Sequence, residues 1–250
     1  MREYKKAFTL AEVLITLGII GVVAAMTIPT LIANTNGAKV RSQFKKTIST
    51  LNQAGLMAQA QYDFDYAGTT EKCTGAATDA GLHPESNMSF CAILNGTLTG
   101  QTYQGVVTNI KRSNNGTEEA YAIKQPAGYG KVLTKATAEA YLAYTLADGS
   151  IVAFSPDAVG CEVPVGTQIT GAYIAANPNC LGFIDVNGAT LPNREVSCTA
   201  VGDQIARRVE EPCAVKNDAN HMTDIFPIFF HDATVEPASA AAKYVLTTSK

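Results

Sequence analysis

An unbroken apolar run near the amino terminus, residues 8–33, limits the possible folds of this chain more than any other feature of its sequence. The run reads FTLAEVLITLGIIGVVAAMTIPTLIA and carries a single charged side chain, Glu12. At a helical rise of about 1.5 Å per residue it is roughly 39 Å long, which is enough to cross a bilayer. The run therefore predicts a membrane-spanning helix.

A conventional secretory signal is the alternative interpretation of the same residues. Basic residues precede the run, and residues 23–25 (VAA) offer a small-x-small cleavage site before Met26. Against this, the apolar stretch continues beyond that site, Pro29 lies inside it, and Glu12 places a carboxylate near its start. Because a charge inside a membrane costs about 2.5–3.5 kcal/mol on insertion scales, an intramembrane acid indicates a function.

The residues around the start of the run resemble a known signal. Residues 5–14 (KKAFTLAEVL), followed by the apolar helix and Pro29, are similar to the class III signal of type IV pilins and type II secretion pseudopilins. The resemblance implies that a prepilin peptidase cuts between Ala7 and Phe8 and then methylates the amino group of Phe8. Glu12 and Pro29 stand where the family typically has Glu and Pro, whereas Ala7 replaces the usual glycine, which predicts less efficient cleavage.

The same resemblance implies a structural subunit and not an enzyme. Its partners would be copies of itself and related pilins in a filament, the prepilin peptidase, an inner-membrane assembly platform and, before assembly, membrane lipid. The protein would cross the bacterial inner membrane once with its head in the periplasm or extracytoplasmic space, and the filament would stand in the periplasm or at the cell surface. The alternative is a signal-anchored extracytoplasmic enzyme or binding protein that does not polymerise.

Cleavage before Phe8 would give Glu12 a positively charged partner. The new α-amino group lies four residues away and can pair with the carboxylate inside one chain. In a staggered bundle the carboxylate can instead meet the amino terminus of a neighbouring copy, which would set the axial register. Apolar helices gain no hydrophobic drive from associating in lipid, so small residues must pack closely there: Gly18, Gly21, Ala24 and Ala25. Pro29 lacks a backbone donor and predicts a bend or a local loosening of the helix.

Residues 34–64 predict an amphipathic continuation of the helix. An apolar or small stripe recurs at steps of three and four, which a head domain has to cover: Val40, Phe44, Ile48, Leu51, Gly55, Ala58 and Tyr62. Four basic residues lie where the helix leaves the bilayer: Lys39, Arg41, Lys45 and Lys46. They face either lipid headgroups or the acidic heads of neighbouring subunits.

Residues 65–250 predict a globular head with an antiparallel sheet, so the fold class is α+β. Short alternating segments are broken there by turn residues. Residues 140–146 and 151–154 predict a hairpin with a type I′ turn at Asp148-Gly149. Further strands are predicted at 181–186, 225–230 and 243–247. With a cleaved leader at 1–7 and a transmembrane helix at 8–33, one principal domain remains.

All six cysteines lie beyond the apolar run, so they would be exported together and could oxidise. Sequence alone does not choose among the possible pairings, and we expect bonds between sequence neighbours: Cys73–Cys91, Cys161–Cys180 and Cys198–Cys213. Each bond would close a loop of about 15 to 20 residues, worth roughly 3 kcal/mol in the chain-entropy model. Such loops would stabilise Gly- and Thr-rich segments that bury little surface.

A calcium site in the head is one expectation for Asp185 and Asn187, together with an oxygen of the following loop. A hard cation needs about six to eight oxygens, and the alternative is a β-turn in which both side chains bond their own backbone. No other cofactor is expected, because the three histidines lack metal-ligand spacing and no cysteine pair is two residues apart.

Charge and motifs argue against two function classes. Residues 47–250 carry 12 basic and 20 acidic side chains, a net charge of −8, so the head should repel nucleic acid. The sequence also contains no G-x-S-x-G, GKS, GKT or H-E-x-x-H motif of common enzymes. A structural subunit is the function that these patterns favour.

Overall fold

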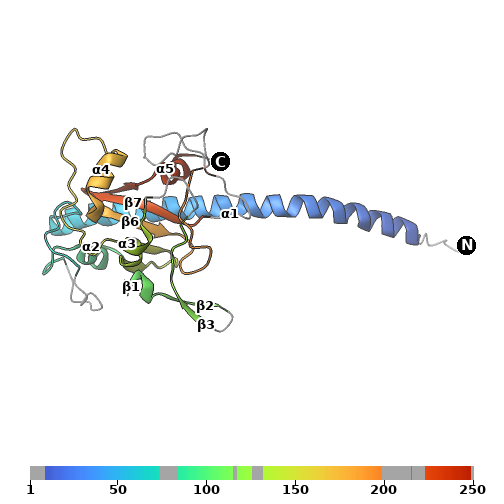
Figure 1. Ribbon diagram of the computed structural model, residues 1–250, viewed down its shortest axis with the longest axis horizontal. Coiled ribbons are helices and arrows are strands. Elements are labelled where there is room, and N and C mark those ends of the chain that lie inside the picture. Colours follow the sequence, from blue (N-terminus) through green and yellow to red (C-terminus); the bar gives the residue numbers. More distant parts are fainter. Residues whose placement is uncertain are drawn as a thin grey trace, which may run out of the picture.

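The computed structural model describes residues 9–73, 84–114, 117–125, 132–198, 215 and 223–248. A single helix, α1 (Leu10–Tyr62), runs through the whole length of the molecule, and the remaining elements gather around its carboxy-terminal half (Figure 1). The helix has 53 residues, about 80 Å at the standard rise, and ends at Asp63 in the left-handed conformation. One continuous helix therefore connects the head to the amino-terminal part of the molecule.

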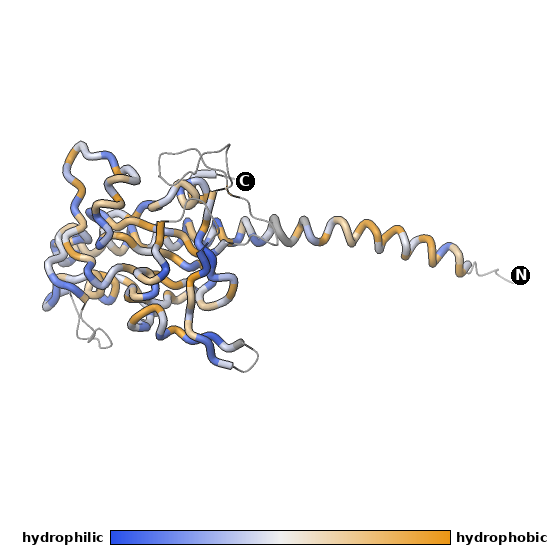
Figure 2. The backbone as a smooth tube through the Cα atoms, viewed as in Figure 1, coloured by the Kyte–Doolittle hydropathy of each residue, from blue (hydrophilic) through white to orange (hydrophobic). Residues whose placement is uncertain are grey.

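The amino-terminal part of α1 contacts nothing else in the described chain. The segment Leu10–Pro29 is long and apolar enough to cross a membrane, and none of it is buried. Figure 2 shows hydrophobic residues along this bare part of the helix. The prediction of an apolar span long enough for a bilayer is confirmed, and the helix continues through Pro29 without interruption.

The second half of α1 buries the predicted stripe against the head. Phe44, Leu51 and Ala58 have no exposed surface, and Val40 and Ile48 are nearly buried. The ring of Phe44 stacks on that of Phe226 with 4.2 Å between centroids. At Gly55 a Cβ would lie 2.6 Å from the Ala233 carbonyl oxygen, so only glycine allows this approach. The apolar periodicity therefore located the helix face that the head covers.

The head contains a six-stranded antiparallel sheet in the order β1-β4-β5-β6-β7-β8. Its strands are β1 (Thr102–Val106), β4 (Leu142–Thr145), β5 (Ile151–Phe154), β6 (Leu181–Asp185), β7 (Ile225–His231) and β8 (Thr234–Pro237). A separate hairpin is formed by β2 (Lys111–Asn114) and β3 (Thr117–Ala120), and it stands away from the main sheet (Figure 1). The sheet confirms the α+β class.

Short helices cover the sheet and complete the core. They are α2 (Phe90–Thr97), η1 (Val107–Asn109), α3 (Lys135–Glu139), α4 (Gly171–Ala176), η2 (Pro178–Cys180) and α5 (Ala240–Thr247). Helix α1 contacts α2, β8 and α5. An aromatic cluster joins α2 to the sheet and to the segment after α1, with Phe90 packed on Tyr66, Phe154 and Phe230 at centroid distances of 5.1 to 5.4 Å.

Two local predictions for the head were wrong. Residues 243–247 are not a strand but belong to α5, because Ser239 caps that helix by accepting from Ala242 N and three alanines follow it. The hairpin of β4 and β5 exists, but its turn is not type I′, since only Gly149 has a positive φ and its N–H bonds Leu146 O at 2.9 Å. The Asp148 side chain instead accepts from Ser150, which holds the turn.

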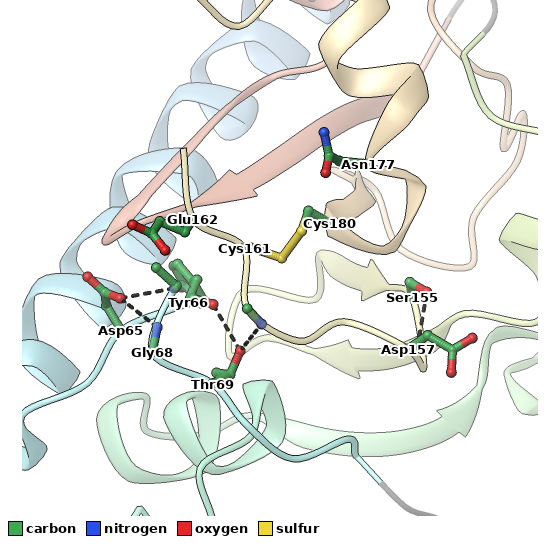
Figure 3. The surroundings of a disulfide bond; sticks show 12 residues. Asp65, Tyr66, Gly68, Thr69, Ser155, Asp157, Cys161, Glu162, Asn177 and Cys180 are labelled. Atoms are coloured by element: carbon green, nitrogen blue, oxygen red, sulfur yellow. Dashed lines mark hydrogen bonds between the residues drawn. A yellow bond between two sulfur atoms is a disulfide. The ribbon is translucent and has the colours of Figure 1, made fainter. Parts of the chain in front are cut away.

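Two of the three predicted disulfides, Cys73–Cys91 and Cys161–Cys180, are present in the structure. Cys198 is also disulfide-bonded, and its predicted partner Cys213 lies outside the described residues. The second bond lies beside the segment that follows α1 (Figure 3), where Gly160 N donates to the Thr69 hydroxyl. Cys161 N also donates to Tyr66 O. The disulfide-closed segment is thus attached to the turn that follows the helix.

The stripe on α1 should be essential for the stability of the head. In a fragment of residues 34–250, Phe44→Ala should lower the free energy of unfolding by about 3–5 kcal/mol, because a fully buried ring is replaced by a cavity. Leu56→Ala on the exposed face of the same helix should change it by less than about 0.5 kcal/mol. Urea unfolding measures both, and equal small effects would mean that the head folds without the helix.

Candidate functional site

The helix begins with a capping box in which Glu12 takes part. Thr9 is the N-cap, and its hydroxyl accepts from Glu12 N at 3.3 Å. In return, one oxygen of the Glu12 carboxylate accepts from both the N–H and the hydroxyl of Thr9 at 2.8 Å. The carboxylate is therefore held at the positive end of the helix dipole, which favours an anion.

Sequence reasoning assigned Glu12 a charged partner but missed Thr9. The signal was present, since a Thr followed three residues later by Glu before an apolar run is the pattern of a capping box. The expected cleavage point between Ala7 and Phe8 lies outside the described residues. The structure does show that the backbone N–H of Thr9, one residue after Phe8, is a direct partner of the Glu12 carboxylate.

The surface of the apolar span is suited to contact with lipid or with other helices. Nothing lies within 4 Å of a Cβ built at Gly18 or Gly21, so both positions are open to the close approach of another backbone. The hydroxyls of Thr16 and Thr27 donate to helix carbonyls, with Thr16 to Glu12 O and Thr27 to Val23 O at 2.9 Å each. Their polarity is thus satisfied within the helix, and Glu12 is the one ionisable side chain of the span.

Pro29 lies inside α1 at the end of this span. Because proline has no backbone N–H, the carbonyl one turn before it lacks its helical donor. The helix is nevertheless continuous on both sides of Pro29 and only gently curved in Figure 1. A kink or local loosening at Pro29 stays a prediction.

In the head, Asp185 lies in a buried polar corner and not on the surface. It has no exposed area and accepts a hydrogen bond from the Tyr121 hydroxyl and another from Asn187 N at 3.2 Å. Asp224 lies nearby and accepts from Asn193 N at 2.9 Å and Arg194 N at 2.6 Å. Residues 185–193 and 224 therefore meet, although about thirty residues separate them in the chain.

Burial sets the acidity of this corner. It raises the pKa of Asp185, and the neighbouring Asp224 charge raises it further. Burial also raises the pKa of Asp224 to about 6, against the opposing effect of the N–H donors of Arg194 and Asn193. Both carboxyls therefore bind a proton more readily in the folded head than in the unfolded chain.

The carboxylates of this corner already have hydrogen-bond donors. All four oxygens of Asp185 and Asp224 accept from N–H or O–H groups, and a hard cation would need about six to eight oxygens directed at it. Within the described residues, no group of three or more His, Cys, Asp or Glu side chains could hold a metal. Calcium at Asp185 and Asn187 stays a prediction.

Comparison with protein families gives one match. Residues 2–28 match a family model described as the prokaryotic N-terminal methylation motif. Neither a curated protein nor a solved structure matches the chain. The matched segment covers residues 2–7 of the predicted leader, Glu12 and most of the bare part of α1, so the chain carries the class III signal of a type IV pilin-like precursor.

The buried acids predict an unusual pH dependence of head stability. The pKa of Asp224 is about 6 in the fold, against an ordinary value of 3.8 for a solvated Asp, so the folded head binds more protons between these values. Stability from this group therefore falls as pH rises through about 6. The stability of the wild type relative to Asp224→Asn should decrease by roughly 1–3 kcal/mol from pH 4 to pH 7. Asp157→Asn, which removes an exposed carboxylate, is the control.

Denaturant titrations at several pH values measure these differences. If the free energy of unfolding of the wild type, relative to that of Asp224→Asn, increased with pH, the raised pKa of Asp224 would be contradicted.

Proposed function

We propose that this chain is the structural subunit of a type IV pilus-like or type II secretion pseudopilus filament. Before assembly it is anchored in the bacterial inner membrane by the apolar half of α1, with its head in the periplasm. The single observation that carries the proposal is the bare segment Leu10–Pro29, none of which is buried, joined to a second half of the helix whose apolar face the head already covers from Val40 to Ala58.

The bare segment has to be covered by two different apolar environments in succession. Its large apolar side chains are about 40 to 80 % exposed, which no stable protein tolerates in water over such a length. Lipid covers them first, and the same surface faces other copies once the subunit leaves the membrane. Lipid-embedded helices associate through close packing and polar contacts, for which Gly18, Gly21 and Glu12 are the available groups.

Glu12 has a position suited to setting the register between copies. Thr9 holds its carboxylate at the start of the helix, close to where cleavage would create the α-amino group of Phe8. In a staggered bundle the carboxylate of one copy can reach the amino terminus of the next. Each added subunit would then repeat the same buried ion pair, which fixes the axial step of the filament.

The head offers little to the alternative of an anchored enzyme. A cavity of about 470 Å³ lies between α3, α4 and the sheet, and its lining is mostly apolar, with Val132, Ile174 and Leu181 among the residues. Tyr141 is the one titratable side chain in that lining, and burial raises its pKa to about 12. The described lining therefore has no acid–base pair, and a polymerising subunit is the better-supported function.

Processing gives the first test of this function. Peptide sequencing of the mature protein should begin at Phe8 with an N-methyl group, because the methylation motif covers residues 2–28. A mature protein that begins at Met26 would indicate a conventional secretory signal. An intact Met1 would favour a simple tether.

The second test replaces Glu12. Glu12→Leu should leave cleavage and membrane insertion intact, because insertion no longer carries the cost of a buried carboxylate. Filament assembly should fail, because the charged terminus of Phe8 would enter the bundle of helices without its counter-ion. Leaving one charge of a buried pair without its partner costs about 3–5 kcal/mol. Yield is measured by shearing and electron microscopy in a strain that makes no other copy.

Glu12→Gln separates charge from shape, since it keeps the size and a hydrogen-bonding group but loses the anion. It should fail in assembly as Glu12→Leu does. Wild-type yield from both variants would mean that apolar packing alone sets the register.

A further inference from the structure

Three basic residues on α1, Lys39, Arg41 and Lys45, form what we call the neck cluster, at the end of the head-covered half of the helix that is nearest the bare span. Lys39 and Lys45 are exposed, and Arg41 is half-buried. Neither lysine has an ion pair with a described residue. The nearby Lys46 is already used, because its ammonium group lies 3.0 Å from the Asp148 carboxylate of the head.

The charge of the neck cluster is not balanced along the helix. Between Glu12 and Asp63, α1 contains four basic residues and no acidic one. The head beyond it carries a net negative charge, so it would be repelled by an anionic membrane surface. Positive charge next to the far side of a membrane span also opposes the usual distribution, in which basic residues stay in the cytoplasm. A specific anionic partner would explain why the charges lie there.

Lys39 is the member of the neck cluster nearest to the headgroup layer. Lys39 lies six residues beyond the apolar run that ends at Ala33, about 9 Å along the helix, and Lys45 about 18 Å. Headgroups add roughly 5–8 Å to each side of the hydrocarbon core, and the Debye length is about 8 Å. Helical side chains also lean toward the amino terminus, which is toward the membrane for both lysines.

We propose that the neck cluster binds the phosphate groups of anionic phospholipids in the outer leaflet of the inner membrane, with Lys39 as the principal contact and Lys45 as a weaker one. This rests on the proposed function, because it requires α1 to be inserted in the membrane before assembly. The contact holds the head at a fixed height above the bilayer, and it is released when the subunit enters the filament.

The full-length protein in nanodiscs of equimolar phosphatidylcholine and phosphatidylglycerol tests this proposal. After release into detergent, native mass spectrometry counts the lipids that stay bound. The wild type should retain phosphatidylglycerol preferentially, and Lys39→Gln should reduce that preference by about fivefold. Lys45→Gln should reduce it less, because Lys45 lies farther from the headgroups. Lys39→Arg should preserve it.

Lys243→Gln is the matched control, since Lys243 is an exposed lysine on α5. Retention of both lipids in the supplied ratio, or an equal loss in Lys243→Gln, would overturn the proposal. So would a Lys39→Gln variant that keeps its lipid preference but loses filament yield, because the cluster would then bind neighbouring subunits. A chain that stays out of the nanodiscs contradicts the membrane-anchored function itself, whereas insertion without lipid preference contradicts this proposal alone.

Discussion

Continuity of α1 through Pro29 is the constraint on which the rest of the structure depends. Because one helix carries both the bare span and the buried stripe, no flexible linker separates the membrane segment from the head. The head packs on Val40 to Ala58 and therefore has a defined height and orientation relative to Leu10–Pro29. An assembly contact made by the span then fixes the position of the head as well, which is the behaviour expected of a filament subunit.

The long helix and its buried face could be predicted from the sequence because their signals are strong. An apolar run of membrane length and a stripe at steps of three and four leave few alternatives. The strands β5, β6 and β7 were found from apolar residues between turns. Residues 243–247 were predicted as a strand, because Tyr244 and Val245 favour strands locally, but the Ser239 cap and the alanines before them decided for a helix.

Long-range pairings could not be read from the sequence. The Asp224 carboxylate accepts hydrogen bonds from the backbone N–H groups of Asn193 and Arg194, about thirty residues earlier in the chain. No local sequence pattern indicates that these groups are its donors. Asp185 was predicted to face a metal or its own turn. It does accept a hydrogen bond from Asn187 N, but it also accepts one from the hydroxyl of Tyr121, more than sixty residues earlier. Thr9, in contrast, had a local signal that could have been used.

Electron cryomicroscopy of sheared filaments tests the central claim most directly. The account predicts that the apolar halves of α1 lie along the filament axis, with Glu12 of one copy next to the amino terminus of another and the heads outside. Heads packed along the axis with Leu10–Pro29 left uncovered would contradict it, as would a filament in which Glu12 faces no neighbouring terminus.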